Sequence, residues 1–201
     1  MVRGATQILL GTASALTLAA GAYIVAAIAD GGEKRVAPDF IGAADFGAWR
    51  LICVPGAPAL AGLLQESAAP ATNACRVNQE VPLGGAGDGA TGQVVLAVNL
   101  SLVGSRKIPA LMVRLPATAQ MGDMIGLRLD NGHEVKTPVR DCEAAQCIAA
   151  GNLSAGDWTE LLAAKAVKVR FPTNGGQMVL VDLKLDGLSA AIAAMRQADG
   201  S

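Results

Sequence analysis

The residues best suited to chemistry in this chain are its four cysteines, Cys53, Cys75, Cys142 and Cys147. Cysteines form disulfides, bind zinc or carry out thiol chemistry, and each role favours a different spacing. Sequence proximity favours two disulfides, Cys53–Cys75 and Cys142–Cys147. The first would close a loop of about 20 residues, which the chain-entropy model values at roughly 3 kcal/mol. The second would fix the shape of a sharp connection between neighbouring elements.

Two other roles for the cysteines stay open at this point. A zinc site with four cysteines usually combines two closely spaced pairs, and Cys53 and Cys75 lie too far apart to be one of them. Thiol redox chemistry usually employs a C-x-x-C motif, which the chain lacks. Structural disulfides are therefore the preferred interpretation, and we expect no metal site.

Catalytic or cofactor-binding residues are not expected. His133 is the only histidine, and it lies in the turn Asp130-Asn131-Gly132-His133 without an obvious nucleophile or carboxylate partner. The glycine-rich stretch 84–92 lacks the Lys-Ser/Thr of a phosphate-binding loop. With 16 basic and 17 acidic residues, the net charge is −1, which argues against nucleic acid as a partner. We therefore predict that the protein is not an enzyme.

The N-terminal residues 1–29 resemble a targeting or membrane segment. Residues 8–29 carry no charge, and a helix of this length crosses a hydrocarbon layer of about 30 Å. The run ends in Ala27-Ile28-Ala29, a small-x-small pattern typical of signal peptidase sites. A retained anchor and a signal peptide cleaved near Ala29 both remain open, and both place the domain in the periplasm. If it is retained, small residues such as Gly11 would let this helix pack against a partner's membrane helix.

The rest of the chain divides into a polar linker (30–45), one domain (46–196) and a short tail (197–201). Alternating or apolar runs between turn signals predict strands throughout the domain. These runs are 48–53, 75–81, 93–103, 110–115, 125–129, 135–139, 166–171 and 178–185. Residues 57–74 indicate a surface loop, with a short helix over 58–64 as the alternative, and 84–92 indicates a mobile turn.

Two short helices complete the expected domain. Ser154 and Asp157 can start one helix, and the stripe Leu188, Ala191, Ile192 and Met195 predicts a second. We predict a mainly β fold, an antiparallel β-sandwich or barrel-like domain with two short helices, preceded by an N-terminal apolar helix.

Several landmarks resemble the invasion-associated locus B family of bacterial envelope proteins. They are Phe46-Gly-Ala-Trp49 before Cys53, Cys75-Arg-Val-Asn-Gln79, Val113-Arg-Leu-Pro116, Asp141-Cys142 with Cys147-Ile-Ala, and the closing Leu185-Asp-Gly187-Leu188. The resemblance spans about residues 46–195, although Gln146 stands where the family often has glycine. It implies a secreted or periplasmic β-rich domain with no catalytic residues to carry over.

Three functions are compatible with these features. The preferred one is a non-enzymatic periplasmic binding or assembly module, including an accessory of a membrane complex if the anchor stays at the inner membrane. The alternative is a surface-exposed adhesion or host-cell invasion factor, and the third is an enzyme. The expected partners are an envelope or membrane protein and, through uncleaved residues 8–29, the membrane. The expected binding surface combines the cysteine-bounded turn 140–150 with the hairpin tip 130–133.

Overall fold

The computed structural model describes residues 40–55, 73–83, 95–117, 119–143, 146–173 and 175–199. The predictions for the N-terminal segment 1–29, the loop or helix before residue 73 and the glycine-rich turn 84–92 lie outside these residues. Within the described ranges, neither helix is long and apolar enough to cross a membrane.

Ten strands form one antiparallel sheet in the order β1-β2-β3-β4-β5-β8-β7-β6-β9-β10. The strands are β1 (Gly42–Phe46), β2 (Trp49–Pro55), β3 (Asn73–Pro82), β4 (Val95–Val103), β5 (Ile108–Pro116), β6 (Met124–Leu129), β7 (Glu134–Glu143), β8 (Gln146–Asn152), β9 (Val167–Pro172) and β10 (Met178–Leu183). Two helices, α1 (Ala155–Ala163) and α2 (Leu188–Ala198), accompany the sheet. The predicted mainly β fold with two short helices is confirmed.

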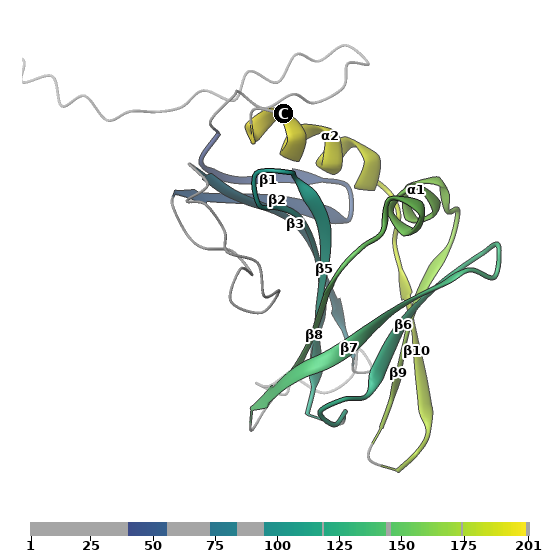
Figure 1. Cartoon of the computed structure of the whole chain (residues 1–201). Helices are drawn as coiled ribbons and strands as arrows, with labels where there is room; N and C mark the ends of the chain where they lie inside the picture. Colours follow the sequence, from purple (N-terminus) through teal and green to yellow (C-terminus); the bar gives the residue numbers. More distant parts are fainter. Residues whose placement is uncertain are drawn as a thin grey trace, which may run out of the picture.

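The sheet bends strongly, so that β6, β9 and β10 lie across from the first strands, with α2 over β1–β3 (Figure 1). The inner face of the bent sheet is apolar because apolar and polar residues alternate along the strands. In β9, for example, Val167, Val169 and Phe171 are buried, while Lys168 is exposed. Each large aliphatic or aromatic side chain removed from water contributes about 1.5–3 kcal/mol. The core therefore sits between the two halves of the sheet and beneath α2.

The predicted apolar stripe of the C-terminal helix is confirmed as core packing. Leu188, Ala191, Ile192 and Met195 are all buried in the main cluster. The preceding Gly187 has φ of 81°, and a Cβ there would overlap the carbonyl oxygen of Phe46. Only glycine permits this close approach between the start of α2 and the β1–β2 hairpin.

Three boundaries differ from the sequence prediction. The tail assigned to 197–201 begins too early, because α2 continues to Ala198. The linker assigned to 30–45 gives way to a strand at its end, because Gly42–Phe46 pairs along its whole length with β2. The prediction of a cysteine-bounded turn over 140–150 is wrong for most of these residues, because they form the end of β7 and most of β8. β8 pairs with β5 on one side and β7 on the other, a tertiary arrangement that its Ala- and Gly-rich sequence did not indicate.

The β6–β7 hairpin forms where Asn131-Gly132 predicted it, but its turn differs. Gly132 has φ of 86°, whereas Asn131 does not have positive φ. The Gly132 N–H donates to the Leu129 carbonyl, and the Leu129 N–H donates to the His133 carbonyl. This geometry is a three-residue loop closed by a glycine bulge, so positive φ is needed at one residue instead of two.

Candidate functional site

The structure joins Cys53 to Cys75 and Cys142 to Cys147. Both bridges are cross-strand, since Cys53 lies opposite Cys75 on β2 and β3, and Cys142 opposite Cys147 on β7 and β8. All four cysteines are described and none is free. This arrangement leaves no thiolate to bind zinc or to act as a nucleophile.

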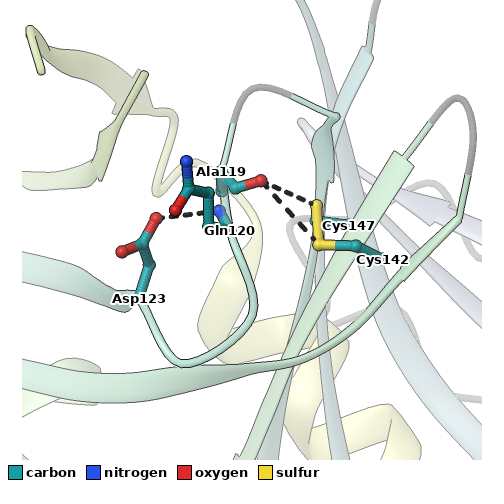
Figure 2. The surroundings of a disulfide bond; sticks show 5 residues. All are labelled: Ala119, Gln120, Asp123, Cys142 and Cys147. Atoms are coloured by element: carbon teal, nitrogen blue, oxygen red, sulfur yellow. Dashed lines mark hydrogen bonds between the residues drawn. A yellow bond between two sulfur atoms is a disulfide. The ribbon is translucent and has the colours of Figure 1, made fainter. Parts of the chain in front are cut away.

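The Cys142–Cys147 bridge packs against the loop that leads into β6 (Figure 2). The Ala119 carbonyl oxygen lies 3.3 Å from Cys147 Sγ and 3.8 Å from Cys142 Sγ. Because the sulfurs of a disulfide carry no hydrogen, this is a packing contact. The same loop is held by the Gln120 N–H, which donates to Asp123 Oδ2 at 2.8 Å. The disulfide therefore supports a connecting loop and offers no reactive group.

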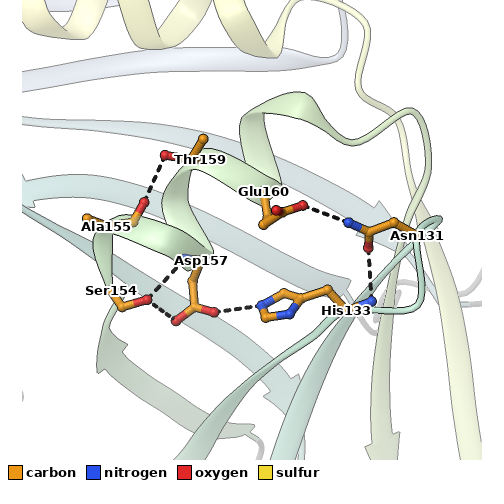
Figure 3. Close-up of polar contacts among 7 residues, drawn as sticks. All are labelled: Asn131, His133, Ser154, Ala155, Asp157, Thr159 and Glu160. Carbon is orange, nitrogen blue, oxygen red and sulfur yellow. Dashed lines mark hydrogen bonds and ion pairs between the residues drawn. The ribbon is translucent and has the colours of Figure 1, made fainter.

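The hairpin tip is attached to α1 through two side-chain contacts (Figure 3). His133 Nε2 lies 2.7 Å from Asp157 Oδ1, and Asn131 Nδ2 donates to Glu160 Oε2 at 2.6 Å. His133 is exposed, as predicted for a turn residue, but it has a carboxylate partner that the sequence did not reveal. The tip is thus held against α1 instead of projecting freely into solvent.

Ser154, Asp157 and His133 together have the residue types of a hydrolytic triad but not its order. Ser154 Oγ donates to Asp157 Oδ2 at 2.7 Å and accepts from the Asp157 N–H at 3.0 Å, as a helix N-cap does. Asp157 lies between the hydroxyl and the imidazole, whereas nucleophile activation requires the base to contact the hydroxyl. The pKa of Asp157 lies below its ordinary value. The hydrogen bond from the Ser154 hydroxyl is the largest cause, and the contact with His133 is the second. These contacts fit a capped helix attached to a hairpin.

The prediction that the tip 130–133 and the turn 140–150 form one binding surface is wrong. The tip precedes the first residue of β7, whereas Cys142 is the ninth of its ten residues, so eight residues lie between them. Figure 1 shows how far apart the two ends of β7 are. At about 3.3 Å per residue, the strand spans about 30 Å. Sequence nearness misled here because an extended strand separates its ends as far as any element can.

An apolar surface lies elsewhere, on the solvent side of β6, β9 and β10. Met124 and Met178 line one cavity of about 170 Å³ together with Pro172, and Leu180 follows on the same face of β10. Met121 lies in the turn that leads into β6. The side chains of Met121, Met124, Met178 and Leu180 are 44–66% exposed. We call Met121, Met124, Pro172, Met178 and Leu180 the methionine face.

The same cavity has a charged side built on Gly126. A Cβ at Gly126 would overlap the Glu134 carboxylate, so the absence of a side chain lets Glu134 lie across β6. Arg170 Nη1 lies 3.3 Å from Glu134 Oε1, and Lys136 Nζ lies 3.9 Å from Oε2. Apolar and ionic groups thus border each other, as they do in many protein-binding surfaces.

Sequence reasoning missed the methionine face, although a signal was present. Met178 and Leu180 alternate with Val179 and Val181, so one of the two apolar sets had to face solvent. The structure buries Val181 and exposes Met178 and Leu180.

Comparison with known proteins bears on the family of this chain. The model of the family described as invasion associated locus B (IalB) protein matches residues 49–196. The chain belongs to this family. Among solved structures, invasion-associated protein B from Bartonella henselae is similar, with a TM-score of 0.56 and 17% sequence identity. The match covers 76% of this chain and 94% of that one, and at this identity it supports the IalB fold alone. A search of curated proteins finds no match.

Proposed function

We propose that this IalB-family chain is a non-enzymatic binding or assembly module on the periplasmic side of the cell envelope. The observation that carries the proposal is the methionine face. Five large apolar side chains are exposed among the described residues, and four of them lie on this one half of the sheet: Met121, Met124, Met178 and Leu180. Met124, Pro172 and Met178 lie together in one cavity, and exposed apolar surface of this kind is typical of interaction sites. Methionine also adapts its shape to different partners.

The two disulfides support a periplasmic location. Disulfides persist in oxidising compartments and are rare in the cytoplasm. The uncharged run 8–29 supports export, because such a run is typical of a signal peptide or a membrane anchor. An alkaline phosphatase fusion after Ser201 tests the location, and an inactive fusion would contradict it.

Binding without turnover is supported by the structural role of the three residues that most resemble a catalytic triad. Ser154, Asp157 and His133 are committed to capping α1 and attaching the hairpin tip. Their order keeps the imidazole away from the hydroxyl that it would have to activate.

Photo-crosslinking in living bacteria tests the proposal. A benzoylphenylalanine placed at Leu180 reports on the methionine face, and one at the exposed Ala163 of α1 is the matched control. We expect a reproducible crosslink to one envelope protein from position 180 and none from position 163. Failure to crosslink from both Met178 and Leu180, with the chain correctly exported, would overturn the proposal.

The alternative is an adhesion or invasion factor, for which the similarity to invasion-associated protein B of Bartonella henselae is the supporting observation. A membrane-impermeant biotin reagent separates the two functions. Labelling of the chain on intact bacteria favours adhesion, whereas labelling only after the outer membrane is opened favours the periplasmic module.

A further inference from the structure

β10 is the end strand of the sheet, and half of its backbone groups point away from its partner. The Thr173 N–H donates to the Gln177 carbonyl across the β9–β10 turn. In an antiparallel pair, hydrogen-bonded positions alternate. Counting along the register from this pair, Val179 and Val181 bond to β9, while the N–H and C=O groups of Met178 and Leu180 point to the open edge.

Side chains of other strands bond the backbone beside β10 at only one end of its open edge, at Lys184. Beyond the last residue of β10, Gln79 of β3 bonds the backbone of Lys184, and the Trp49 Nε1–H donates to the Lys184 carbonyl at 2.7 Å. Among the described residues, no strand other than β9 pairs with Met178–Leu183.

Nothing in β10 itself protects this edge. Natural end strands are usually interrupted by proline, lysine, a bulge or a covering element. β10 reads Met-Val-Leu-Val-Asp-Leu, and its one charge, Asp182, lies 3.0 Å from Lys168 Nζ. The opposite edge contrasts with it, because β1 reads Gly-Ala-Ala-Asp-Phe and packs beneath α2.

Charge on the neighbouring strands indicates what would lie beside β10. The outward side chains of β6, β9, β10 and the first half of β7 include four cations and two carboxylates, which gives a local charge of +2 against −1 for the whole chain. The cations are Arg128, Lys136, Lys168 and Arg170, and the carboxylates are Glu134 and Asp182. A second copy of β10 would bring an equally cationic face alongside, so charge favours an acidic partner over a dimer.

We propose that the open edge of β10 binds an extended segment of a partner protein whose side chains alternate between apolar and acidic. The segment adds to the sheet as an eleventh strand. Its backbone bonds the free groups of Met178 and Leu180. Because successive residues of a strand point to opposite faces, its acidic side chains lie on the outward face, which carries Lys168 and Arg170, and its apolar side chains lie on the other face, beside Val179 and Val181. This inference rests on the proposed binding function and specifies its partner.

Synthetic peptides test the proposal on the wild-type full chain with its disulfides intact. The probe is a fluorescent, end-blocked decapeptide of alternating Val and Glu, used at a concentration where it is monomeric. A Val/Lys peptide tests charge, and a Val/Glu peptide N-methylated on alternate residues tests backbone hydrogen bonding. We expect fluorescence anisotropy to show at least tenfold weaker binding for both controls. Equal binding of the N-methylated peptide, or of the Val/Lys peptide, overturns the proposal.

Two variants locate the binding on β10. Leu180→Pro removes an N–H that bonds no other strand, so the β9 pairing survives, while Leu180→Thr retains that N–H. Near-ultraviolet circular dichroism verifies that both variants are folded. We expect at least a tenfold loss for Leu180→Pro and a smaller loss for Leu180→Thr. Equal affinities for both variants and wild type place the peptide elsewhere and overturn the proposal.

Other occupants of the edge give distinct results. A dimer in analytical ultracentrifugation that Leu180→Pro abolishes makes a second copy the occupant. Sedimentation with vesicles containing 30% anionic phospholipid, undiminished by Leu180→Pro, makes the face a membrane-binding surface. Either result overturns strand addition. If crosslinking from Leu180 succeeds in cells while the peptides fail, the binding function stands and strand addition falls.

Discussion

The side-chain amide of Gln79 on β3 bonds both backbone groups of Lys184, the residue that follows β10. Gln79 Nε2 donates to the Lys184 carbonyl at 2.7 Å, and the Lys184 N–H donates to Gln79 Oε1 at 3.0 Å. A buried side chain thus takes the place of a neighbouring strand at the point where the two ends of the bent sheet meet. Gln79 is the last residue of Cys75-Arg-Val-Asn-Gln79, one of the segments that resemble the IalB family, so this contact gives that segment a structural role.

Gln79→Ala should destabilise the fold by about 1–3 kcal/mol, because it leaves the Lys184 N–H without its acceptor. Gln79→Glu should also destabilise it, since a carboxylate can accept from the N–H but cannot donate to the carbonyl. Urea unfolding followed by circular dichroism measures both changes. Gln177→Ala, at an exposed glutamine, is the control and should change stability little. Equal midpoints for Gln79→Ala and wild type would contradict the role of this contact.

The fold could be predicted in large part because most strands alternate strongly. Val167, Val169 and Phe171 face the core in the two-residue period that the sequence shows. β8 was missed because Ala149, Ala150 and Gly151 provide almost no contrast between its faces, although Ala149 and Ala150 are buried. Only the partners on both sides make that stretch a strand, and a single sequence does not reveal them.

The two disulfides should differ in their contribution to stability. Cys53 and Cys75 are 22 residues apart, and Cys142 and Cys147 are 5 apart. The chain-entropy model values loops of these lengths at about 3 and about 2 kcal/mol respectively. Replacing both cysteines of the first pair by alanine should therefore lower the denaturation midpoint more than replacing both of the second. A larger loss from the second pair would show that holding the loop at Ala119 outweighs chain entropy.

The contact between α1 and the hairpin tip should be visible in the titration of Asp157. Ser154→Ala removes the largest cause of its lowered pKa and should raise that pKa more than His133→Ala does. Loss of the N-cap should also cost about 1 kcal/mol of stability. Carboxyl carbon NMR measures the titrations, and thermal melts measure the stability. A larger pKa change from His133→Ala would reverse the assigned order of causes.

The pH dependence of this contact has a definite sign. The folded pKa of Asp157 is below its unfolded value, so its contribution is complete above the unfolded pKa of about 3.9 and is lost as the pH falls through the folded pKa. The stability difference between wild type and Asp157→Asn should therefore shrink in acid. Such a difference growing in acid would contradict the assignment.

The candidate sites were less predictable than the fold, for two physical reasons. His133 and Asp157 are 24 residues apart in sequence, and their contact depends on how the hairpin leans on α1. On β10, Asp182 shares the two-residue period of Met178 and Leu180, so the sequence does indicate which apolar set faces solvent. It does not reveal that Met124 of β6 and Pro172 of β9 lie beside Met178, because that depends on how the three strands pair.

The carboxyl group of Asp199 after α2 should contribute less to the free energy of unfolding at neutral than at acidic pH. Its side chain is 3% exposed, Lys107 Nζ lies 3.7 Å from Oδ2, and Oδ1 has no hydrogen-bond partner. Burial raises the pKa of Asp199, and Lys107 only partly opposes this. The folded state thus binds the proton more tightly than the unfolded chain, and this group's contribution falls as the pH rises from the unfolded pKa to the raised folded pKa. A negative charge at the C-terminus of a helix is unfavourable in any case.

Asp199→Asn should therefore raise the melting temperature at pH 7, and its advantage should disappear below about pH 3.9, where both states of the wild-type carboxyl are protonated. Melts at several pH values measure the difference, with Glu143→Gln, at an exposed position, as the control for the loss of one charge. Lys107 Nζ donates to the Asp199 backbone carbonyl at 3.2 Å, and the substitution leaves this hydrogen bond in place. A lower melting temperature for Asp199→Asn at pH 7 would show instead that the ion pair with Lys107 outweighs the burial of the charge.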